Sequence, residues 1–181
     1  MSFDDEGFFR SGDALKFIDP AQPGRGFAFD GRTAEDFKLS TGTFVSVGPL
    51  RSRVIAAGDP CVQDVVVTGL DRDDIGLLIF PRVDSCRSLA NLPASAPLAE
   101  VLEAPPVRHF FQGLVDQMFA TGTGSATRIA RAFVMAAPPS IDLGEVTDKG
   151  SINQRAALTH RADWVEALYA GTDPSILLPR L

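Results

Sequence analysis

The sequence is poor in the residues that build metal centres and disulfide frameworks. Its 181 residues include two cysteines, Cys61 and Cys86, and two histidines, His109 and His160. Two cysteines fit neither a disulfide framework nor a cysteine-rich zinc site, and two histidines argue against a histidine-based metal centre. We therefore expect no resident metal and a reducing, cytoplasmic environment.

Long apolar runs and an excess of basic residues are also missing. The longest apolar stretch, residues 75–80, falls far short of the roughly 20 residues that cross a bilayer. Because 23 acidic residues outnumber 17 basic ones, for a net charge of −6, the chain lacks the cationic surface that duplex nucleic acid or an anionic membrane requires. The first residues are acidic where a signal peptide is basic. We expect a cytoplasmic protein with no nucleic acid and no membrane among its partners.

The chain does contain enough apolar material for one folded domain, since 45% of its residues are hydrophobic. Apolar spacing of three and four predicts helices, and continuous apolar runs are typical of strands covered on both faces. The order of these elements predicts an α+β fold with a small mixed β-sheet packed against helices. The expected elements are strands 14–19 and 27–30, helix 47–58, strands 62–68 and 75–80, one or two short helices within 84–106, helix 107–119, strand 129–135 and helix 162–170.

Two polar segments near the N-terminus are compatible with a chemical role. Asp13 follows a glycine and precedes an apolar strand, where a carboxylate can accept hydrogen bonds from the vicinal hydroxyls of a ribose. The spacing alone favours a turn residue that caps local amides. Residues 29–42 mix dense charge with Gly31 and Gly42 and suit a hinge, with Arg32 offered to a ribose or phosphate. The residues alone favour a solvated hairpin.

A third polar segment, residues 145–155, places Lys149 beside Gly150 and ahead of a helical run. An ammonium group there can act as a point charge on a developing oxyanion or phosphate, although a surface lysine is usually only solvated. Residues 121–125, Thr-Gly-Thr-Gly-Ser, have the composition of a phosphate cradle, but they follow a helix and lack a Gly-Lys-Ser/Thr ending. We interpret them as a connector.

Three phrases, taken together and in order, resemble the C-terminal part of the adenylate-forming acyl-CoA synthetases of the AMP-binding enzyme family, and most closely the feruloyl-CoA synthetases. They are Phe-Arg-Ser-Gly-Asp at 9–13, Asp-Gly-Arg-Thr-Ala-Glu-Asp-Phe-Lys-Leu-Ser-Thr-Gly-Thr at 30–43 and Thr-Asp-Lys-Gly-Ser-Ile-Asn-Gln-Arg at 147–155. The family uses ATP and Mg²⁺ to convert a carboxylic acid to an acyl-adenylate, and then transfers the acyl group to coenzyme A. The resemblance implies trailing strands of a truncated N-terminal adenylation domain at residues 1–32 and a C-terminal lid domain at 33–181.

The resemblance also implies roles for single residues. Asp13 matches the aspartate that holds the ribose hydroxyls of ATP, and Arg32 matches an arginine that contacts the same nucleotide. Lys149 matches the lysine that neutralises charge during adenylation. Many relatives place that lysine after the glycine, at the position of Ser151, whereas Lys149 precedes Gly150.

A hinge and a coenzyme A contact follow from the second phrase in the same way. The commoner hinge pattern has one residue fewer between the arginine and the glycine, so Ala34, Glu35 and Asp36 are all candidates for the pivot. Gly42 lies where relatives present backbone to the pantetheine arm of coenzyme A.

Relatives of this kind are several times longer, and their phosphate loop, adenine pocket and acid pocket lie upstream of the first phrase. The resemblance therefore implies that ATP or AMP, Mg²⁺ and coenzyme A bind the full-length enzyme and not this chain alone, which is inactive by itself. The implied partners are an aromatic acid, ATP, coenzyme A and the missing N-terminal adenylation domain. One alternative is a non-catalytic module with the lid fold that pairs with a separate adenylation domain, and another is an enzyme that acylates a carrier-protein thiol.

Two structural expectations follow from a missing large domain. Asp13, Arg32 and Lys149 should be exposed, because their partners are absent. The strands at 14–19 and 27–30 should carry an apolar patch where neighbouring strands are lost.

Overall fold

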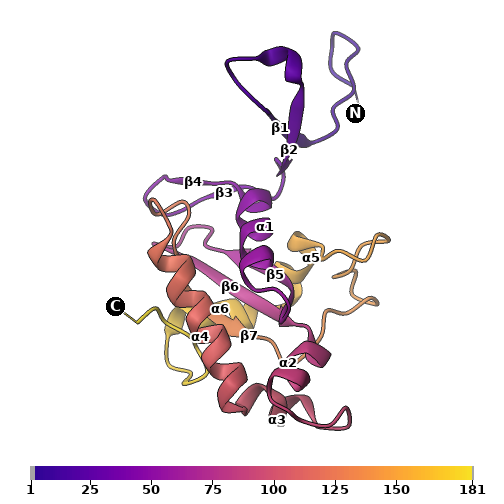
Figure 1. Cartoon of the computed structure of the whole chain (residues 1–181). Coiled ribbons are helices and arrows are strands. Elements are labelled where there is room, and N and C mark those ends of the chain that lie inside the picture. Colours follow the sequence, from indigo (N-terminus) through magenta and orange to yellow (C-terminus); the bar gives the residue numbers. More distant parts are fainter. Residues whose placement is uncertain (1–2, 181) are drawn as a thin grey trace.

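A three-stranded mixed sheet lies between two groups of helices, and a two-stranded hairpin projects from one end of the molecule (Figure 1). The computed structural model describes residues 3–180. In chain order the elements are β1 (Asp13–Phe17), the 3-10 turn η1 (Pro23–Arg25), β2 (Phe27–Arg32), β3 (Phe37–Lys38), β4 (Phe44–Val45), α1 (Val47–Ala57), β5 (Val62–Thr68), β6 (Ile75–Pro81), α2 (Val83–Leu89), α3 (Leu98–Glu103), α4 (Pro105–Ala120), β7 (Ile129–Val134), α5 (Gln154–His160) and α6 (Ala162–Ala170).

The central sheet has the order β5–β6–β7, with β5 antiparallel and β7 parallel to β6. Side chains on successive residues of a strand point to opposite faces, and this alternation divides the core in two. Val65 and Leu77 face one cluster with α1 to α4, whereas Val66 and Leu78 face a second cluster with α5 and α6. The prediction that these apolar strands are covered on both faces is therefore confirmed.

The long helix α4 covers the first face of the sheet. Val107, Phe111, Leu114 and Met118 recur at intervals of three and four, so they share one stripe and are all buried. The helix begins at Pro105, two residues before the predicted start, because proline suits a first helical turn in which its missing N–H is not needed. The predicted helices at 47–58, within 84–106 and at 162–170 are also present.

The polar segment after β2 differs from the solvated hairpin that its composition favours. It forms a short antiparallel pair, β3 with β4, in which Phe37 is opposite Val45. Both side chains are buried, as is Leu39. The apolar residues between the charges thus anchor this hairpin to the first core cluster. The strand predicted at 14–19 ends at Phe17, since the carboxylate of Asp19 accepts the N–H of Ala21 and starts a turn.

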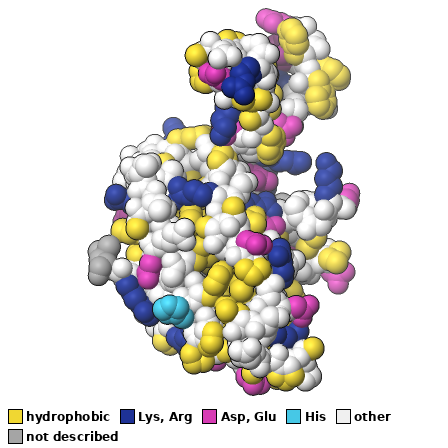
Figure 2. Space-filling view, viewed as in Figure 1, with side chains coloured by type: hydrophobic (Ala, Val, Ile, Leu, Met, Phe, Trp, Pro, Cys, Tyr) yellow, Lys and Arg dark blue, Asp and Glu magenta, His cyan; other side chains and the backbone are white. Residues whose placement is uncertain are grey.

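The hairpin of β1 and β2 carries the expected apolar patch. Leu15 and Phe29 are 61% and 63% exposed, and Phe17 stacks on the exposed Phe27 with ring centroids 4.7 Å apart. Figure 2 shows hydrophobic side chains gathered on this projecting part of the molecule. An exposed apolar surface of this kind is typical of an interaction site.

The described residues include neither a membrane-spanning helix nor a cluster of metal ligands. No helix between residues 3 and 180 is both long and apolar enough to cross a membrane. In the same residues, no group of three or more His, Cys, Asp or Glu side chains could hold a metal ion.

Candidate functional site

A groove of about 610 Å³ brings together two of the three residues singled out in the polar segments. One wall is the end of β2 with Arg32, the second is the exposed face of α1, and the third is the loop at 147–153 with Lys149. Arg32 and Lys149 are far apart in the sequence, so the fold creates this proximity. Asp13 does not line the groove, but it lies opposite Arg32 in the β1–β2 register.

Lys149 lies in a tight turn that two backbone hydrogen bonds close. The N–H of Thr147 donates to the carbonyl of Ser151 and the N–H of Gly150 donates to that of Thr147, both at 2.8 Å. The hydroxyls of Thr147 and Ser151 are also 2.8 Å apart. Gly150 has a φ of +79°, a conformation that favours glycine and closes the turn. The Lys149 side chain is exposed and forms no ion pair within residues 3–180.

Asp13 and Arg32 are both exposed, as expected. Neither the Asp13 carboxylate nor the Arg32 guanidinium has a hydrogen bond to another described residue. The amide of Asp13 donates to the hydroxyl of Ser11 at 3.1 Å, but its carboxylate does not cap the local turn. Both charged groups are therefore available to a ligand.

The three hinge candidates differ in their attachments. Ala34 is exposed and Glu35 is half-buried, and the N–H of Glu35 donates to the carbonyl of Arg32 at 3.0 Å. The carboxylate of Asp36 instead accepts the N–H of Val47 at 2.9 Å and so caps the start of α1. This bond fixes Asp36 to the body of the domain.

Gly42 lies outside the groove, at the turn between β3 and β4. Its N–H donates to the carbonyl of Leu39 at 2.8 Å, and the residue is exposed. The adjacent Thr43 hydroxyl accepts a hydrogen bond from Ser125 at 3.2 Å. The glycine-rich segment that contains Ser125 joins α4 to β7 and is a connector, as predicted.

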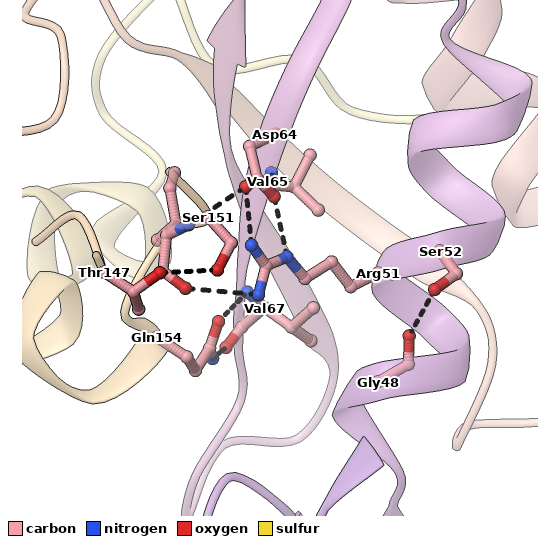
Figure 3. Close-up of polar contacts among 10 residues, drawn as sticks. Gly48, Arg51, Ser52, Asp64, Val65, Val67, Thr147, Ser151 and Gln154 are labelled. Carbon is pink, nitrogen blue, oxygen red and sulfur yellow. Dashed lines mark hydrogen bonds and ion pairs between the residues drawn. The ribbon is translucent and has the colours of Figure 1, made fainter. Parts of the chain in front are cut away.

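Beneath the groove, α1 and β5 contribute an ion pair that the sequence interpretation missed. Arg51 and Asp64 form two parallel bonds, Nε to Oδ1 at 2.7 Å and Nη2 to Oδ2 at 2.5 Å, and both side chains line the groove (Figure 3). Asp64 is 8% exposed. A charged residue inside an otherwise apolar strand was the available signal, because a buried carboxylate needs a partner.

The Lys149 loop is anchored at both ends by buried polar side chains. Upstream, Glu145 bonds Arg161 at 2.9 and 2.7 Å, and this hydrogen bonding holds the pKa of Glu145 below its usual value. Downstream, Gln154 accepts the N–H of Val67 at 3.1 Å and donates to the Val67 carbonyl at 2.5 Å. The loop is thus attached to α6 and to β5.

The groove can place positive charge against an anionic ligand. Arg51 is neutralised by Asp64, which leaves Arg32 and Lys149 as the cationic groups without an internal partner. Glu35 and Asp148 also line the groove, and its described lining includes no histidine or cysteine. The two cations are suited to binding an anionic ligand and to charge stabilisation.

Comparisons with known proteins show the family to which the chain is similar. Residues 36–173 match the family described as the AMP-binding enzyme C-terminal domain, over more than half of the chain. The chain is 24% identical to the probable acyl-activating enzyme 16, chloroplastic, of Arabidopsis thaliana over 173 residues. The matched region covers 92% of this chain and 23% of that protein. The chain thus spans about a quarter of the length of this relative.

Solved structures show the same fold. The adenylation domain of a carboxylate reductase from Mycobacterium chelonae has a TM-score of 0.62 at 22% identity, over 93% of this chain and 24% of that one. The corresponding domain from Segniliparus rugosus, in complex with AMP and a carboxylic acid, has a TM-score of 0.60 at 20% identity, over 95% and 25%. An anthranilate CoA ligase in complex with anthranoyl-AMP has a TM-score of 0.54 at 20% identity, over 88% and 25%. The mixed α+β fold predicted from the sequence is confirmed as that of the C-terminal part of these proteins.

Proposed function

We propose that this chain, which belongs to the family of AMP-binding enzyme C-terminal domains, is the mobile lid of an AMP-forming acyl-CoA ligase. In the proposed reaction, a carboxylate oxygen of the acid attacks the α-phosphorus of ATP, the bond to the β-phosphate breaks and pyrophosphate leaves. The sulfur of coenzyme A then attacks the carbonyl carbon of the acyl-adenylate, AMP leaves with the electron pair of the C–O bond, and the thiol proton passes to solvent. A large N-terminal domain supplies the remaining contacts to ATP and the acid.

The observation that carries this proposal is that Arg32 and Lys149 line one groove. Adenylation brings a carboxylate to a phosphate, so negative charge accumulates at the point of attack. Lys149, held at the tip of a closed turn, would neutralise that charge, and Arg32 would contact the same nucleotide. Asp13 would accept hydrogen bonds from the ribose hydroxyls beside Arg32.

The hinge and the second half-reaction belong to the same proposal. Asp36 is tied to α1, so we assign the pivot to Ala34 and Glu35, before the capping bond. Rotation there would withdraw Lys149 and present the β3–β4 turn, with Gly42, to the pantetheine arm. We also propose an aromatic acid of the feruloyl type as substrate, on the resemblance of the three phrases that contain Asp13, Arg32 and Lys149.

The proposal is tested by supplying the full chain, in trans, with the large domain of an aromatic-acid CoA ligase. With ATP, the matching acid and hydroxylamine, we expect acyl hydroxamate only when both parts are present. Pyrophosphate exchange into ATP should likewise be absent with the 181-residue chain alone. A mixture that binds ATP and the acid and yet forms no hydroxamate would contradict the proposal.

Lys149 is tested in the same mixture through the two half-reactions. Lys149→Ala should slow pyrophosphate exchange by ~10²–10³, the usual loss when an electrostatic stabiliser is removed. Thioester formation from preformed acyl-adenylate should change little. Lys16→Ala is the control, since Lys16 pairs with Asp30 at 2.6 Å and lies outside the groove. Equal loss in both half-reactions would exclude the role proposed for Lys149, and full activity would favour a non-catalytic interaction module.

A further inference from the structure

We propose that Arg51 and Asp64 are positioning residues that hold the Lys149 turn over the groove, and so control the adenylation half-reaction without touching the reacting atoms. This inference rests on the function proposed above for Lys149. It concerns a pair of polar residues that line the groove and that the three phrases do not include (Figure 3).

The pair is built as a rigid unit. The Asp64 carboxylate accepts both Arg51 bonds and, in addition, the N–H of Val65 at 2.8 Å and the N–H of Ile152 at 3.2 Å. Each carboxylate oxygen thus has two donors. The register of β5 against β6 is irregular between Val62 and Asp64, and such a bulge redirects the side chain beside it. The fork of Arg51 matches the carboxylate in two places, which fixes its orientation as well as its charge.

Arg51 and Asp64 both form hydrogen bonds to the backbone of Ile152, the residue that follows the turn. Asp64 accepts the N–H of Ile152, and Nη1 of Arg51 donates to the carbonyl of Ile152 at 3.3 Å. The Ile152 side chain is buried in the second core cluster. Ile152 is therefore held through its donor, its acceptor and its side chain, and Ser151, immediately before it, closes the turn on Thr147. A fixed Ile152 sets where the tip of this turn lies.

One face of α1 relates this turn to the strand that carries Arg32. Gly48, Arg51 and Ile55 lie on the same helix face and all line the groove. Gly48 contacts the backbone of Gly31, directly before Arg32, so closely that a Cβ added at Gly48 would lie 2.5 Å from the Gly31 Cα. In this arrangement α1 contacts the residue before Arg32 through Gly48 and the residue after the Lys149 turn through Arg51, and rotation at the proposed pivot would break the first of these contacts while the second moves with α1.

A second ion pair in the same molecule provides a matched control. Arg131 and Asp74 also form two parallel bonds, at 2.9 and 2.8 Å, and are also partly buried. Arg131 donates further to the carbonyls of Leu168 and Tyr169 at the end of α6, far from the groove lining. The two pairs have the same chemistry and differ in what they hold.

Amide hydrogen exchange on the chain alone tests whether Arg51 and Asp64 hold the Ile152 backbone. Asp64→Asn should speed exchange of the Ile152 amide by about tenfold, which corresponds to the loss of one ordinary hydrogen bond. Asp74→Asn should leave that amide unchanged. Arg51→Lys retains the charge but loses the fork, and it is the second variant if Asp64→Asn folds poorly. Unchanged exchange in both groove variants would overturn the inference.

Kinetics with the large domain in trans separate positioning from general stability. Asp64→Asn should lower kcat for pyrophosphate exchange by roughly 10- to 100-fold, because a displacement of about 1 Å has an effect of this size. The KM for ATP and the thioester step should change less than about twofold, and Asp74→Asn should match wild type. Equal losses in Asp64→Asn and Asp74→Asn would reduce the pair to a structural role. If Lys149→Ala has no effect, the proposed function fails, while the exchange experiment still decides whether the pair holds the turn.

Discussion

The contact between Gly31 and Gly48 gives a prediction whose size follows from the structure. In Gly48→Ala, the new Cβ would lie 2.5 Å from the Cα and 3.1 Å from the nitrogen of Gly31. Carbon atoms in ordinary contact are about 3.5–4.0 Å apart, so the two segments must separate by roughly 1 Å. Both neighbours are backbone, and no side-chain rotation can relieve the clash. Overpacking of this kind costs about 1–3 kcal/mol.

Alanine also favours a helix over glycine by up to about 1 kcal/mol, which would mask part of this cost. Gly113→Ala is the matched control, because Gly113 lies in α4 and its added Cβ would meet nothing within 4 Å. The helix preference largely cancels between the two variants. We therefore expect Gly48→Ala to have a free energy of unfolding lower than that of Gly113→Ala by about 1–3 kcal/mol.

Urea denaturation followed by the fluorescence of the single tryptophan, Trp164, measures this difference. Trp164 packs on Phe133 of the second core cluster at 4.9 Å, so its emission reports unfolding of the sheet. Trypsin provides a local measurement, since displacement of β2 should speed cleavage after Arg32. The reasoning is refuted if Gly48→Ala is as stable as Gly113→Ala and is cleaved at the wild-type rate.

Three further substitutions test other parts of the structure. Glu145→Gln should lower the free energy of unfolding by about 3–5 kcal/mol at neutral pH, because Arg161 becomes a buried charge without a partner. Because the pKa of Glu145 is lowered in the fold, the difference in free energy of unfolding between wild type and Glu145→Gln is complete above about pH 5. The difference is lost as the pH falls below 4.5 and through the folded-state pKa. A difference that does not depend on pH would contradict this prediction. Gln154→Ala should cost roughly 1–3 kcal/mol for each Val67 backbone group left unpaired and should speed exchange of the Val67 amide, whereas an unchanged amide would refute the contact. Phe29→Ser should reduce the binding of a hydrophobic dye with little change in unfolding, and undiminished binding would place the apolar surface elsewhere.

The residues of the core show what local patterning can predict. Val107, Phe111 and Met118 identify α4 because helical periodicity is a property of neighbouring residues. The continuous apolar runs at 65–67 and 77–79 predict the buried strands 62–68 and 75–80 for the same reason, and both are present in the central sheet. The segment at 29–42 enters a hairpin, as its composition favoured, but the hairpin is not simply solvated, because the dense charge concealed two buried side chains, Phe37 and Leu39.

The sequence predicted the single residues of the candidate site but not which of them share a groove. Short phrases singled out Asp13, Arg32 and Lys149, since each depends on a few adjacent residues. Their exposure also followed from the sequence, once a large domain was expected to be absent.

The residue pattern by itself determined the elements and the two-sided burial of the sheet, because each depends on near neighbours in the chain, and the family resemblance predicted the exposure of Asp13, Arg32 and Lys149. Only the tertiary structure decided that Arg32 and Lys149 share a groove and that Arg51 and Asp64 hold the backbone of Ile152. The hydrogen bond from Arg51 to Ile152 joins residues 101 positions apart. Periodicity carries no information about residue pairs so distant in the sequence, because the packing of the helices and strands decides which of them become neighbours.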